Sequence, residues 1–256
     1  MILAIDIGNT NIVFGINQKD TWLNDWRIQT DPLKMADEYK VIFSSLLSDS
    51  GIDTSAIDEV IISSVVPSLV YPFTEMLSEL LPVSNIKTLG PDVYPKLSIK
   101  ILNPYQIGSD LVANAVAAFE KYGKHTTIID FGTALTFTTI GRNSEIAGVA
   151  IAPGLNTAVS ALAGKTAQLP QIHLSAPPSV LGKNTIHAIQ SGVIYGFSGL
   201  VDSIIDRIQN EMNEKLNVVA TGGLSHVIAP LTKNVKIIEP MLTLDGLNLV
   251  NKYVAK

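Results

Sequence analysis

The sequence predicts an α/β protein that contains two similar domains. One short pattern, an apolar run followed by a polar turn with Asp and Gly and then a second apolar run, occurs at residues 1–14 and again at 126–140. This pattern is typical of two strands joined by a tight turn, and its recurrence in each half indicates an internal repeat. Helical and strand-like segments also alternate along both halves. We therefore expect domains at 1–112 and 113–256, each with a mixed sheet flanked by helices.

The composition limits the possible partners. Of the 256 residues, 46% are hydrophobic and 16% are charged, and the formal net charge is -5 at pH 7. No run of Lys or Arg stands out, so nucleic acid is not an expected partner. The absence of cysteine excludes disulfides, thiolate zinc sites and cysteine nucleophiles. Asp6 interrupts the N-terminal apolar run, and no uninterrupted apolar stretch approaches the roughly eighteen residues of a membrane span. We expect a soluble cytoplasmic protein that does not enter the membrane.

The opening hairpin is expected to continue into a third antiparallel strand at Trp22–Ile28. Because Trp22 and Trp26 are four residues apart in this strand, they are expected to share the face that packs on the core. Asp31-Pro32 then supplies a cap and a first-turn proline for a helix that runs through Leu47.

The later segments repeat strand and helix patterns. Asp58–Val66 is a continuous β-branched run too short for a typical helix, which predicts a buried parallel strand. The first half is completed by a helix over 68–81, short strands near Ile86 and Ile99, and a linking helix over 111–122 that Ser109 or Asp110 caps. The second half is expected to contain strands at 126–130, 134–140, 145–152, 217–220 and 235–238, and helices at 154–163, 184–212, after Gly222-Gly223 and at 244–254.

The first turn, Asp6-Ile7-Gly8-Asn9-Thr10, has the groups needed to bind phosphate. Gly8 lets backbone N–H groups approach a phosphate, and Asn9 and Thr10 add side-chain donors. The carboxylate of Asp6 can orient a hydrated Mg²⁺ that bridges nucleotide phosphates. A plain hairpin would also favour Asn and Gly. The second copy, Asp130 to Thr133, favours phosphate binding, because two opposed turns could hold a polyphosphate between the domains.

Two further glycine-containing segments resemble nucleotide sites. Gly222-Gly223 follows an apolar strand and opens a helix, where paired glycines let a flat ring or a phosphate pack against the backbone. A simple strand-to-helix turn explains the same residues. Gly164-Lys165-Thr166 is not a P-loop, because Val159 occupies the position of the first glycine and a helix, not a strand, precedes the segment.

Asp110 lies where the linking helix begins, within Gly108-Ser109-Asp110. A carboxylate at the mouth of a cleft between domains could accept the proton of an attacking hydroxyl, which is the role of the base in phosphoryl transfer. Aspartate at such a place is more commonly an N-cap. Spacing and chemistry alone leave the cap as the simpler explanation.

Eight motifs occur in order along nearly the whole chain: Asp6-x-Gly-Asn-Thr10, Asn103-Pro-x-x-x-Gly108-x-Asp110, Asp130-Phe-Gly-Thr-Ala134, Pro153-Gly-Leu155, Thr166-Ala-x-Leu-Pro170, Gly182-Lys-Asn-Thr185, Thr221-Gly-Gly223 and Leu242-Thr-Leu-x-Gly-Leu247. In these motifs the chain resembles type III pantothenate kinases. The resemblance implies the duplicated actin-like (ribonuclease H-like) fold of the acetate and sugar kinase/Hsp70/actin superfamily, with the nucleotide cleft between the domains. It further implies a homodimer with the active site near the subunit interface, and ATP-dependent phosphorylation of pantothenate, the first step of coenzyme A biosynthesis.

The resemblance also assigns roles to particular positions. Asp110 matches the general base, and Asp130 matches the ligand of an activating monovalent cation, potassium or ammonium. The ATP-binding residues expected from the motifs are Asp6, Ile7, Gly8, Asn9, Thr10, Asn11, Ile12, Val13, Thr133, Gly222 and Gly223, with Asp6 holding Mg²⁺ through water. The pantothenate contacts expected are Gly108, Ser109, Asp110, Leu111, Thr166 and Thr185.

Two positions depart from the family pattern. The family usually has Arg directly after the catalytic Asp, where this chain has Leu111, and Tyr nine residues before it, where this chain has Ile101. Arg binds a carboxylate bidentately and Leu cannot, so losing the contact would cost about 1.5–3 kcal/mol of binding free energy. Lys165 or Lys183 could supply the missing charge. A kinase of the same fold with another small hydroxylated acceptor, and a nucleotide-binding paralogue without kinase activity, therefore stay open as alternatives.

Overall fold

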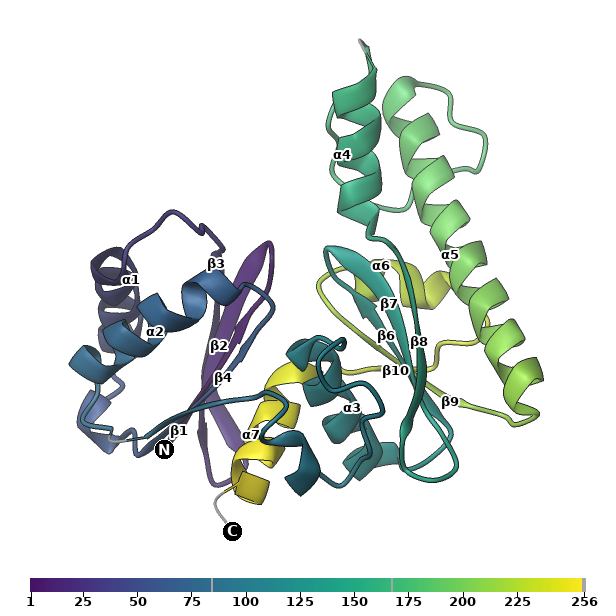
Figure 1. The fold of residues 1–256 in the computed structure, drawn as a ribbon. Coiled ribbons are helices and arrows are strands. Elements are labelled where there is room, and N and C mark those ends of the chain that lie inside the picture. Colours follow the sequence, from purple (N-terminus) through teal and green to yellow (C-terminus); the bar gives the residue numbers. More distant parts are fainter. Residues whose placement is uncertain (84, 167, 255–256) are drawn as a thin grey trace. The chain divides into compact units, whose positions relative to one another are not determined.

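The computed structural model describes residues 1–83, 85–166 and 168–254 (Figure 1). The chain divides into two compact units. The first unit contains residues 1–117 together with the C-terminal helix α7 (Leu242–Val254), and the second contains residues 118–241. The expected domains, 1–112 and 113–256, differ from these units in two respects: the boundary falls at 117/118, and α7 belongs to the first unit. Residues 255 and 256 of the expected second domain lie outside the described residues.

The first unit contains a mixed five-stranded sheet with the strand order β3-β2-β1-β4-β5. The strands β1, β2 and β3 form an antiparallel meander, while β4 is parallel to β1 and β5 is parallel to β4. The bounds of these strands are β1 (Ile2–Ile7), β2 (Asn11–Gln18), β3 (Thr21–Gln29), β4 (Glu59–Ser64) and β5 (Ile86–Thr88). The predicted hairpin, third strand and buried parallel strand are therefore confirmed.

The second unit repeats this arrangement with the order β10-β9-β6-β7-β8. Again the first three strands form an antiparallel meander, and the next two lie parallel beside its first strand. The bounds are β6 (Thr126–Phe131), β7 (Ala134–Ile140), β8 (Ile146–Pro153), β9 (Asn217–Thr221) and β10 (Ile237–Ile238). Both Asp-containing turns thus join the first two strands of equivalent sheets, as the internal repeat predicted.

One face of the first sheet is covered by α1 (Ala36–Asp49) and α2 (Pro67–Leu80), and α7 lies on the other face (Figure 1). Aromatic rings fill the space between the sheet and the two helices. The centroids of Phe14 and Phe43 are 4.0 Å apart, and Phe73 meets Phe43 edge-on at 5.7 Å. All three side chains are fully buried. Each such side chain contributes roughly 1.5–3 kcal/mol of stabilisation by leaving water.

Helix α7 packs on β1, β2 and β4 and against the helix α3 (Ser109–Tyr122), which contributes its first nine residues to the first unit. Gly246 lies so close to α3 that a Cβ would overlap the carbonyl oxygen of Ala113. Trp22 Nε1 donates a hydrogen bond to Asp245 Oδ1 at 2.7 Å. These contacts explain why the last helix joins the first sheet. The sequence pattern predicted a helix there but contained nothing that specified the sheet on which it packs.

The expectation that Trp22 and Trp26 share a face is wrong. The register of β2 and β3 shifts between Ile16 and Asn17, which pairs Trp26 with Phe14 but Trp22 with Asn17. Trp26 stacks on Phe14 in the core with α1 and α2, whereas Trp22 packs over Gly15 and reaches α7. An extra residue in one strand reverses the alternation of side chains.

In the second unit the helices are α4 (Leu155–Lys165), α5 (Thr185–Met212) and the short α6 (Ser225–Ile228), and the second half of α3 also belongs here. Asn184 caps α5 by accepting a hydrogen bond from the backbone N–H of His187 at 2.8 Å. The core contains Ile129 and Phe137 from the sheet, with apolar residues of α5 packed among them.

Helix α5 would also be long and apolar enough to cross a membrane, since one eighteen-residue stretch has a mean hydropathy of 1.3. Its composition has a simpler explanation. Ile194, Val201 and Ile205 are fully buried in the core of the second unit. A helix packed in the core of a protein can be as long and as apolar as a membrane span.

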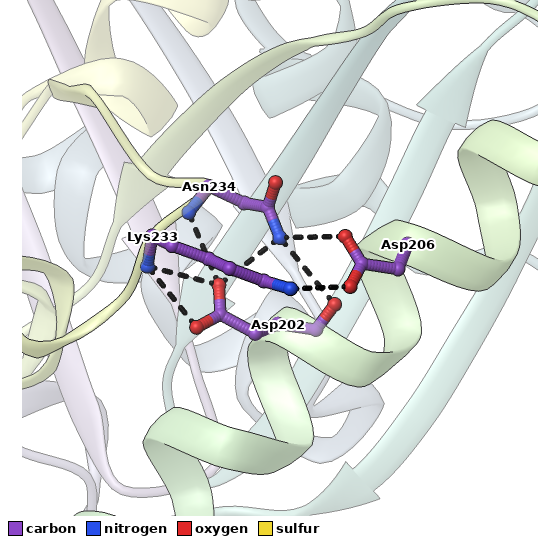
Figure 2. Close-up of polar contacts among 4 residues, drawn as sticks. All are labelled: Asp202, Asp206, Lys233 and Asn234. Atoms are coloured by element: carbon purple, nitrogen blue, oxygen red, sulfur yellow. Dashed lines mark hydrogen bonds and ion pairs between the residues drawn. The ribbon is translucent and has the colours of Figure 1, made fainter.

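A polar cluster ties the chain before β10 to α5 (Figure 2). Asp202 accepts hydrogen bonds from the backbone N–H groups of Lys233 and Asn234 at 3.0–3.1 Å, and Asp206 accepts from Lys233 Nζ at 2.7 Å and Asn234 Nδ2 at 3.0 Å. The hydrogen bond from Lys233 also lowers the pKa of Asp206. Because these carboxylates are already paired with donors of the same unit, we interpret the cluster as a structural link.

Two local predictions need correction. Helix α1 begins at Ala36, not at Asp31-Pro32, because Glu38 Oε2 accepts the N–H of Met35 at 2.9 Å and fixes the first turn there. Asp31 instead accepts from Leu33 N at 3.0 Å in the preceding turn. Within residues 85–166, no strand forms around Ile99. A short 3₁₀ helix at 94–96 precedes this position, and the chain there has only a bridge residue. Another short 3₁₀ helix lies at 54–56.

Candidate active site

The phosphate-binding turn expected in the first unit is compact and supported from β3. Gly8 N–H donates to Asn11 O at 3.0 Å, and a Cβ at Gly8 would come equally close to that oxygen. Thr30, which directly follows β3, donates through Oγ1 to Gly8 O at 2.6 Å and through its N–H to Thr10 O at 3.0 Å. The side chains of Asn9 and Thr10 are exposed. The turn therefore presents polar groups to solvent on a fixed backbone.

Asp6 lies one residue before the end of β1, where it is half-buried. Its neighbours across the sheet are Val13 in β2 and Ser63 in β4. The carboxylate is therefore held by a central strand and sits directly beneath the turn that begins at Gly8. A group on a rigid strand keeps its position better than one on a loop.

The second turn has the same relation to its own sheet. Asp130 lies one residue before the end of β6, with Thr136 in β7 and Thr221 in β9 as its neighbours across the sheet. Gly132 N–H donates to Ala134 O at 3.2 Å, as Gly8 donates to Asn11 in the first unit. Asp6 with Ser63 and Asp130 with Thr221 are thus equivalent pairs in the two sheets.

The start of α4 supports this second turn. The carbonyl oxygen of Thr133 accepts hydrogen bonds from Gly154 N at 3.0 Å and from Thr157 Oγ1 at 2.7 Å. A Cβ at Gly154 would overlap the carbonyl oxygens of both turn residues, Gly132 and Thr133. Only glycine therefore allows the helix to begin so close to the turn.

Gly222 brings the β9–α6 loop onto Asp130. Its φ of +85° lies in the left-handed region, and a Cβ would be 2.5 Å from Asp130 Oδ1. Ser225 holds the loop by donating from Oγ to Gly222 O at 2.7 Å. The structure thus brings together three of the expected site residues of the second unit. Gly222 lies against Asp130, and Thr133 lies in the turn that follows Asp130. The exposed Gly223 follows them in the chain.

Asp110 lies in the first turn of α3, in the first unit, and its carboxylate folds back over the start of its own helix. Oδ1 accepts a hydrogen bond from Leu111 N at 2.8 Å, and it lies so close to Gly108 that a Cβ there would overlap it. Burial raises the pKa of the Asp110 carboxyl group, while backbone hydrogen bonds act in the opposite direction. A raised pKa makes the carboxylate a stronger base than an exposed aspartate.

Ser109 attaches this helix start to β4. Its Oγ is 2.9 Å from Ser63 Oγ, accepts the N–H of Ser64 at 3.1 Å and is 3.2 Å from Ser64 O. The expected alternative caps, Ser109 and Asp110, both lie inside the helix instead of before it. Asp110 is consequently not the N-cap residue, although its carboxylate satisfies an N–H group of the first turn of its own helix.

Sequence reasoning missed three residues of the site. Tyr94 is buried in the first unit, and its pKa is raised to about 12, chiefly by burial and secondly by the negative charge of Asp110. Thr30 and Thr157 support the two turns. Irregular chain or another strand lies between each of these residues and the motif that it contacts or affects. No regular spacing in the sequence therefore predicts their role.

The residues expected to contact the acceptor are divided between the units. Leu111, in the first unit, is 8% exposed, whereas Lys165, Thr166, Lys183 and Thr185 are exposed in the second. Thr166 Oγ1 donates to Leu162 O at 2.8 Å and so ends α4, and Thr185 is the first residue of α5. Neither unit contains the full set by itself.

Among residues 1–83, 85–166 and 168–254, no group of three or more His, Asp or Glu side chains could hold a metal ion. A site for Mg²⁺ does not require such a group, because Mg²⁺ is commonly held by one or two carboxylates together with substrate phosphates and water. The half-buried carboxylate of Asp6, below an exposed polar turn, fits that kind of site.

The repeated sheet with its two Asp-containing turns defines a duplicated actin-like α/β fold. A solved structure of the activator of the 2-hydroxyisocaproyl-CoA dehydratase from Clostridium difficile with bound ADPNP has this fold, with a TM-score of 0.60 at 12% identity over 99% of this chain and 96% of that one. The family model described as type III pantothenate kinase matches residues 2–207. The type III pantothenate kinase from Moorella thermoacetica is 44% identical to this chain, and the alignment covers 98% of each protein. The type III pantothenate kinase from Geotalea daltonii is 42% identical, and the alignment covers 98% of this chain and 97% of that relative. The chain belongs to the type III pantothenate kinase family.

Proposed function

We propose that this protein phosphorylates pantothenate to 4'-phosphopantothenate with ATP, the first step of coenzyme A biosynthesis. Family membership supports the reaction, and one structural observation supports the mechanism: Asp110 is held by the helix start beside the sheet that carries the Asp6 turn. A base and a phosphate-binding turn on one rigid scaffold are the parts that phosphoryl transfer requires.

The two turns would bind the phosphates of ATP. In the first unit the residues are Asp6 to Val13, whose backbone is fixed by Thr30. In the second unit they are Thr133, Gly222 and Gly223. When bound at Asp6 through water, Mg²⁺ would neutralise phosphate charge that develops during transfer.

Asp130 would hold a monovalent cation, potassium or ammonium. The close approach of Gly222 supports this role. Because residue 222 has no side chain, the backbone of the β9–α6 loop lies directly beside the carboxylate of Asp130. Backbone carbonyls and a carboxylate are suitable ligands for a hard cation. The role of Asp130 in the chain would then be to keep the cation next to the second turn.

Asp110 would act as the general base. Its carboxylate accepts the proton of the primary hydroxyl of pantothenate while that oxygen attacks the γ-phosphate of ATP in line. The bond between the γ-phosphorus and the bridging oxygen of ADP breaks, and the proton remains on Asp110 until solvent removes it. The raised pKa of Asp110 favours this transfer.

The residue after Asp110 supports a second candidate, a kinase for another small hydroxylated acceptor. Leu111 is buried and carries no charge at the position where relatives of this family usually have Arg. Gly108, Leu111, Thr166 and Thr185, with the backbone of Ser109, remain the proposed acceptor contacts, and Lys165 or Lys183 would supply the positive charge for the carboxylate of pantothenate. Both lysines are exposed.

We further propose that the protein is a homodimer in the cytoplasm with its active site near the subunit interface. Apolar side chains are exposed on the second unit, among them Ile151 of the edge strand β8 at 69% and Leu181 at 83% exposure. Val149, which is 39% exposed, lies two residues before Ile151 in β8, so these two side chains share one face of the sheet. Contiguous exposed apolar groups are typical of surfaces that bind a partner. Light scattering after size-exclusion chromatography tests this: a single species of 27.5 kDa would contradict it.

The experiment that tests the function is ADP release by the purified protein with ATP, Mg²⁺, potassium and pantothenate. We expect turnover that depends on pantothenate, with a smaller rate for other small hydroxylated acids. Turnover only with another acceptor would support the second candidate. ATP binding without turnover on any acceptor would contradict both, and would be the behaviour of a nucleotide-binding paralogue without kinase activity.

A further inference from the structure

We propose that Ser109 is a positioning residue: its hydroxyl, together with that of Ser63, fixes the start of α3 to β4 and thereby sets where the Asp110 carboxylate lies relative to the Asp6 turn. The inference rests on the proposed function, since it assigns a role within that active site. It differs from the role implied by the family motif, in which Ser109 contacts pantothenate.

The hydrogen bonds of Ser109 use the full capacity of its hydroxyl group. A serine hydroxyl has one proton and two acceptor positions. Ser109 Oγ accepts the N–H of Ser64 at 3.1 Å and pairs with Ser63 Oγ at 2.9 Å, and its own proton can reach Ser64 O at 3.2 Å. With Ser63 as donor, every one of these bonds is satisfied at once. The side chain of Ser109 is then fully engaged with β4 and has no position left for a substrate.

This pair of hydroxyl groups is buried. Ser63 is 0% exposed and Ser109 is 6% exposed. Hydrogen bonds between buried groups have no competing water, and removing one partner leaves the other unsatisfied, which costs more than the bond itself is worth. The link between α3 and β4 is therefore stiffer than a surface contact would be.

The link joins the two chemical groups of the first unit. Ser63 is the cross-sheet neighbour of Asp6 in the parallel pairing of β1 and β4, and Ser109 directly precedes Asp110. Only the Ser63–Ser109 pair and one peptide unit separate the strand position beside Asp6 from the base. The carboxylate of Asp110 is itself bound to Leu111 N at 2.8 Å, so it moves with the helix start.

A purely local role does not explain these contacts. An N-cap serine bonds the N–H groups of its own helix, whereas the side-chain partners of Ser109 all lie in β4. The consequence for catalysis is geometric. A displacement of about 1 Å in a reacting group can lower the rate by roughly a hundredfold, so a loose helix start would affect phosphoryl transfer more than ATP binding.

The test compares Ser109→Ala with the wild type and with Ser198→Ala. Ser198 is a matched control because it is also a buried helical serine, 8% exposed, whose hydroxyl bonds a backbone carbonyl at 2.9 Å, and it lies in α5. Four quantities are measured: kcat and the KM for pantothenate at saturating ATP, the KM for ATP, and the pKa of Asp110 from ¹³C NMR of aspartate carboxyl groups, assigned with Asp110→Asn.

For Ser109→Ala we expect kcat to fall by about ten- to a hundredfold, with the KM for ATP within about twofold of wild type and with an altered Asp110 titration. Ser198→Ala should match the wild type in all four quantities. Ser63→Ala, which leaves both bonds to Ser64 intact, should have a smaller effect than Ser109→Ala.

If Ser109→Ala changed neither the Asp110 titration nor kcat, the positioning role would be overturned. Turnover of pantothenate by the wild type would still support the proposed function in that case. If the wild type did not turn over pantothenate, the proposed function would fail, and the NMR titration would still decide the positioning role. An unchanged kcat with a raised KM for pantothenate would identify Ser109 as a substrate contact and would also overturn the proposal.

Discussion

Gly222 lies directly against the carboxylate of Asp130, because a Cβ at Gly222 would be only 2.5 Å from Asp130 Oδ1. The φ of Gly222 is +85°, a conformation that side chains with a Cβ rarely adopt. The β9–α6 loop therefore reaches the second turn only because residue 222 is glycine.

Gly222→Ala is expected to destabilise the protein and to disturb Asp130. The left-handed backbone would cost about 1–3 kcal/mol of folding free energy, and the overlap would push the carboxylate away from the loop. We expect a lower midpoint in urea unfolding and, from the proposed role of Asp130, no activation by potassium. Gly148→Ala is the control, since a Cβ at Gly148 in β8 meets no atom within 4 Å. Potassium activation that persists in Gly222→Ala would contradict the role of Asp130.

Gly246→Ala is expected to weaken the attachment of α7 to the first unit. A Cβ at this position would overlap the carbonyl oxygen of Ala113, so α7 must move away from α3. Overpacking of this kind costs roughly 1–3 kcal/mol. Urea unfolding measures the change. The control is Gly199→Ala in α5, where a Cβ meets nothing within 4 Å, and where alanine should stabilise the helix by about 1 kcal/mol. Equal stability of both variants would be incompatible with the tight packing of α7.

Gly108→Ala is expected to lower kcat without loss of ATP binding. A Cβ at Gly108 would overlap Asp110 Oδ1, and the carboxylate would have to leave its bond to Leu111 N. The phosphate-binding turn does not involve Gly108 and should be unaffected. Single-turnover kinetics with pantothenate, together with nucleotide titration, separate these effects. A variant that bound ATP poorly but transferred phosphate at the normal rate would show that Gly108 acts elsewhere.

The raised pKa of Asp110 predicts a pH dependence of stability. In the folded protein this carboxyl group binds its proton more tightly than in the unfolded chain, because burial disfavours the charge. Its contribution is therefore most favourable below the unfolded pKa near 3.8 and is lost as the pH rises through the folded pKa. Asp110→Asn should thus be more stable than the wild type at pH 7.5, and the difference should shrink towards pH 4. Urea unfolding at several pH values checks this, and a constant difference would count against it.

Much of the fold could be predicted from the sequence. Each apolar run that flanks the Asp6 and Asp130 turns is short, β-branched and ended by glycine, so strand type and turn position follow from local rules. Because the turn pattern occurs twice, the sequence also predicted that the two halves contain equivalent sheets. Local rules failed where one extra residue changed the register, as at Trp22, and where tertiary contacts chose among sheets, as for α7.

The candidate site was predictable only in part. Asp6, Asp130 and Gly222 lie in short motifs whose chemistry is visible in the sequence. The link between Ser63 and Ser109 joins residues 46 positions apart. It depends on the alignment of α3 with the end of β4, which no periodicity specifies. The negative charge of Asp110 raises the pKa of Tyr94, and irregular chain separates these two residues in the sequence. No pattern in the sequence therefore predicts the effect.

The most direct test of the mechanism is the rate of ADP release with saturating ATP, Mg²⁺, potassium and pantothenate for the wild type and for Asp110→Asn. Removing a general base that acts in the transition state lowers the rate by about 10²–10⁴-fold, while ATP binding measured by titration should be unchanged because Asp110 does not hold phosphate. We expect this large loss of kcat with retained ATP affinity. Wild-type turnover that survives Asp110→Asn unchanged would contradict the assignment of Asp110 as the catalytic base.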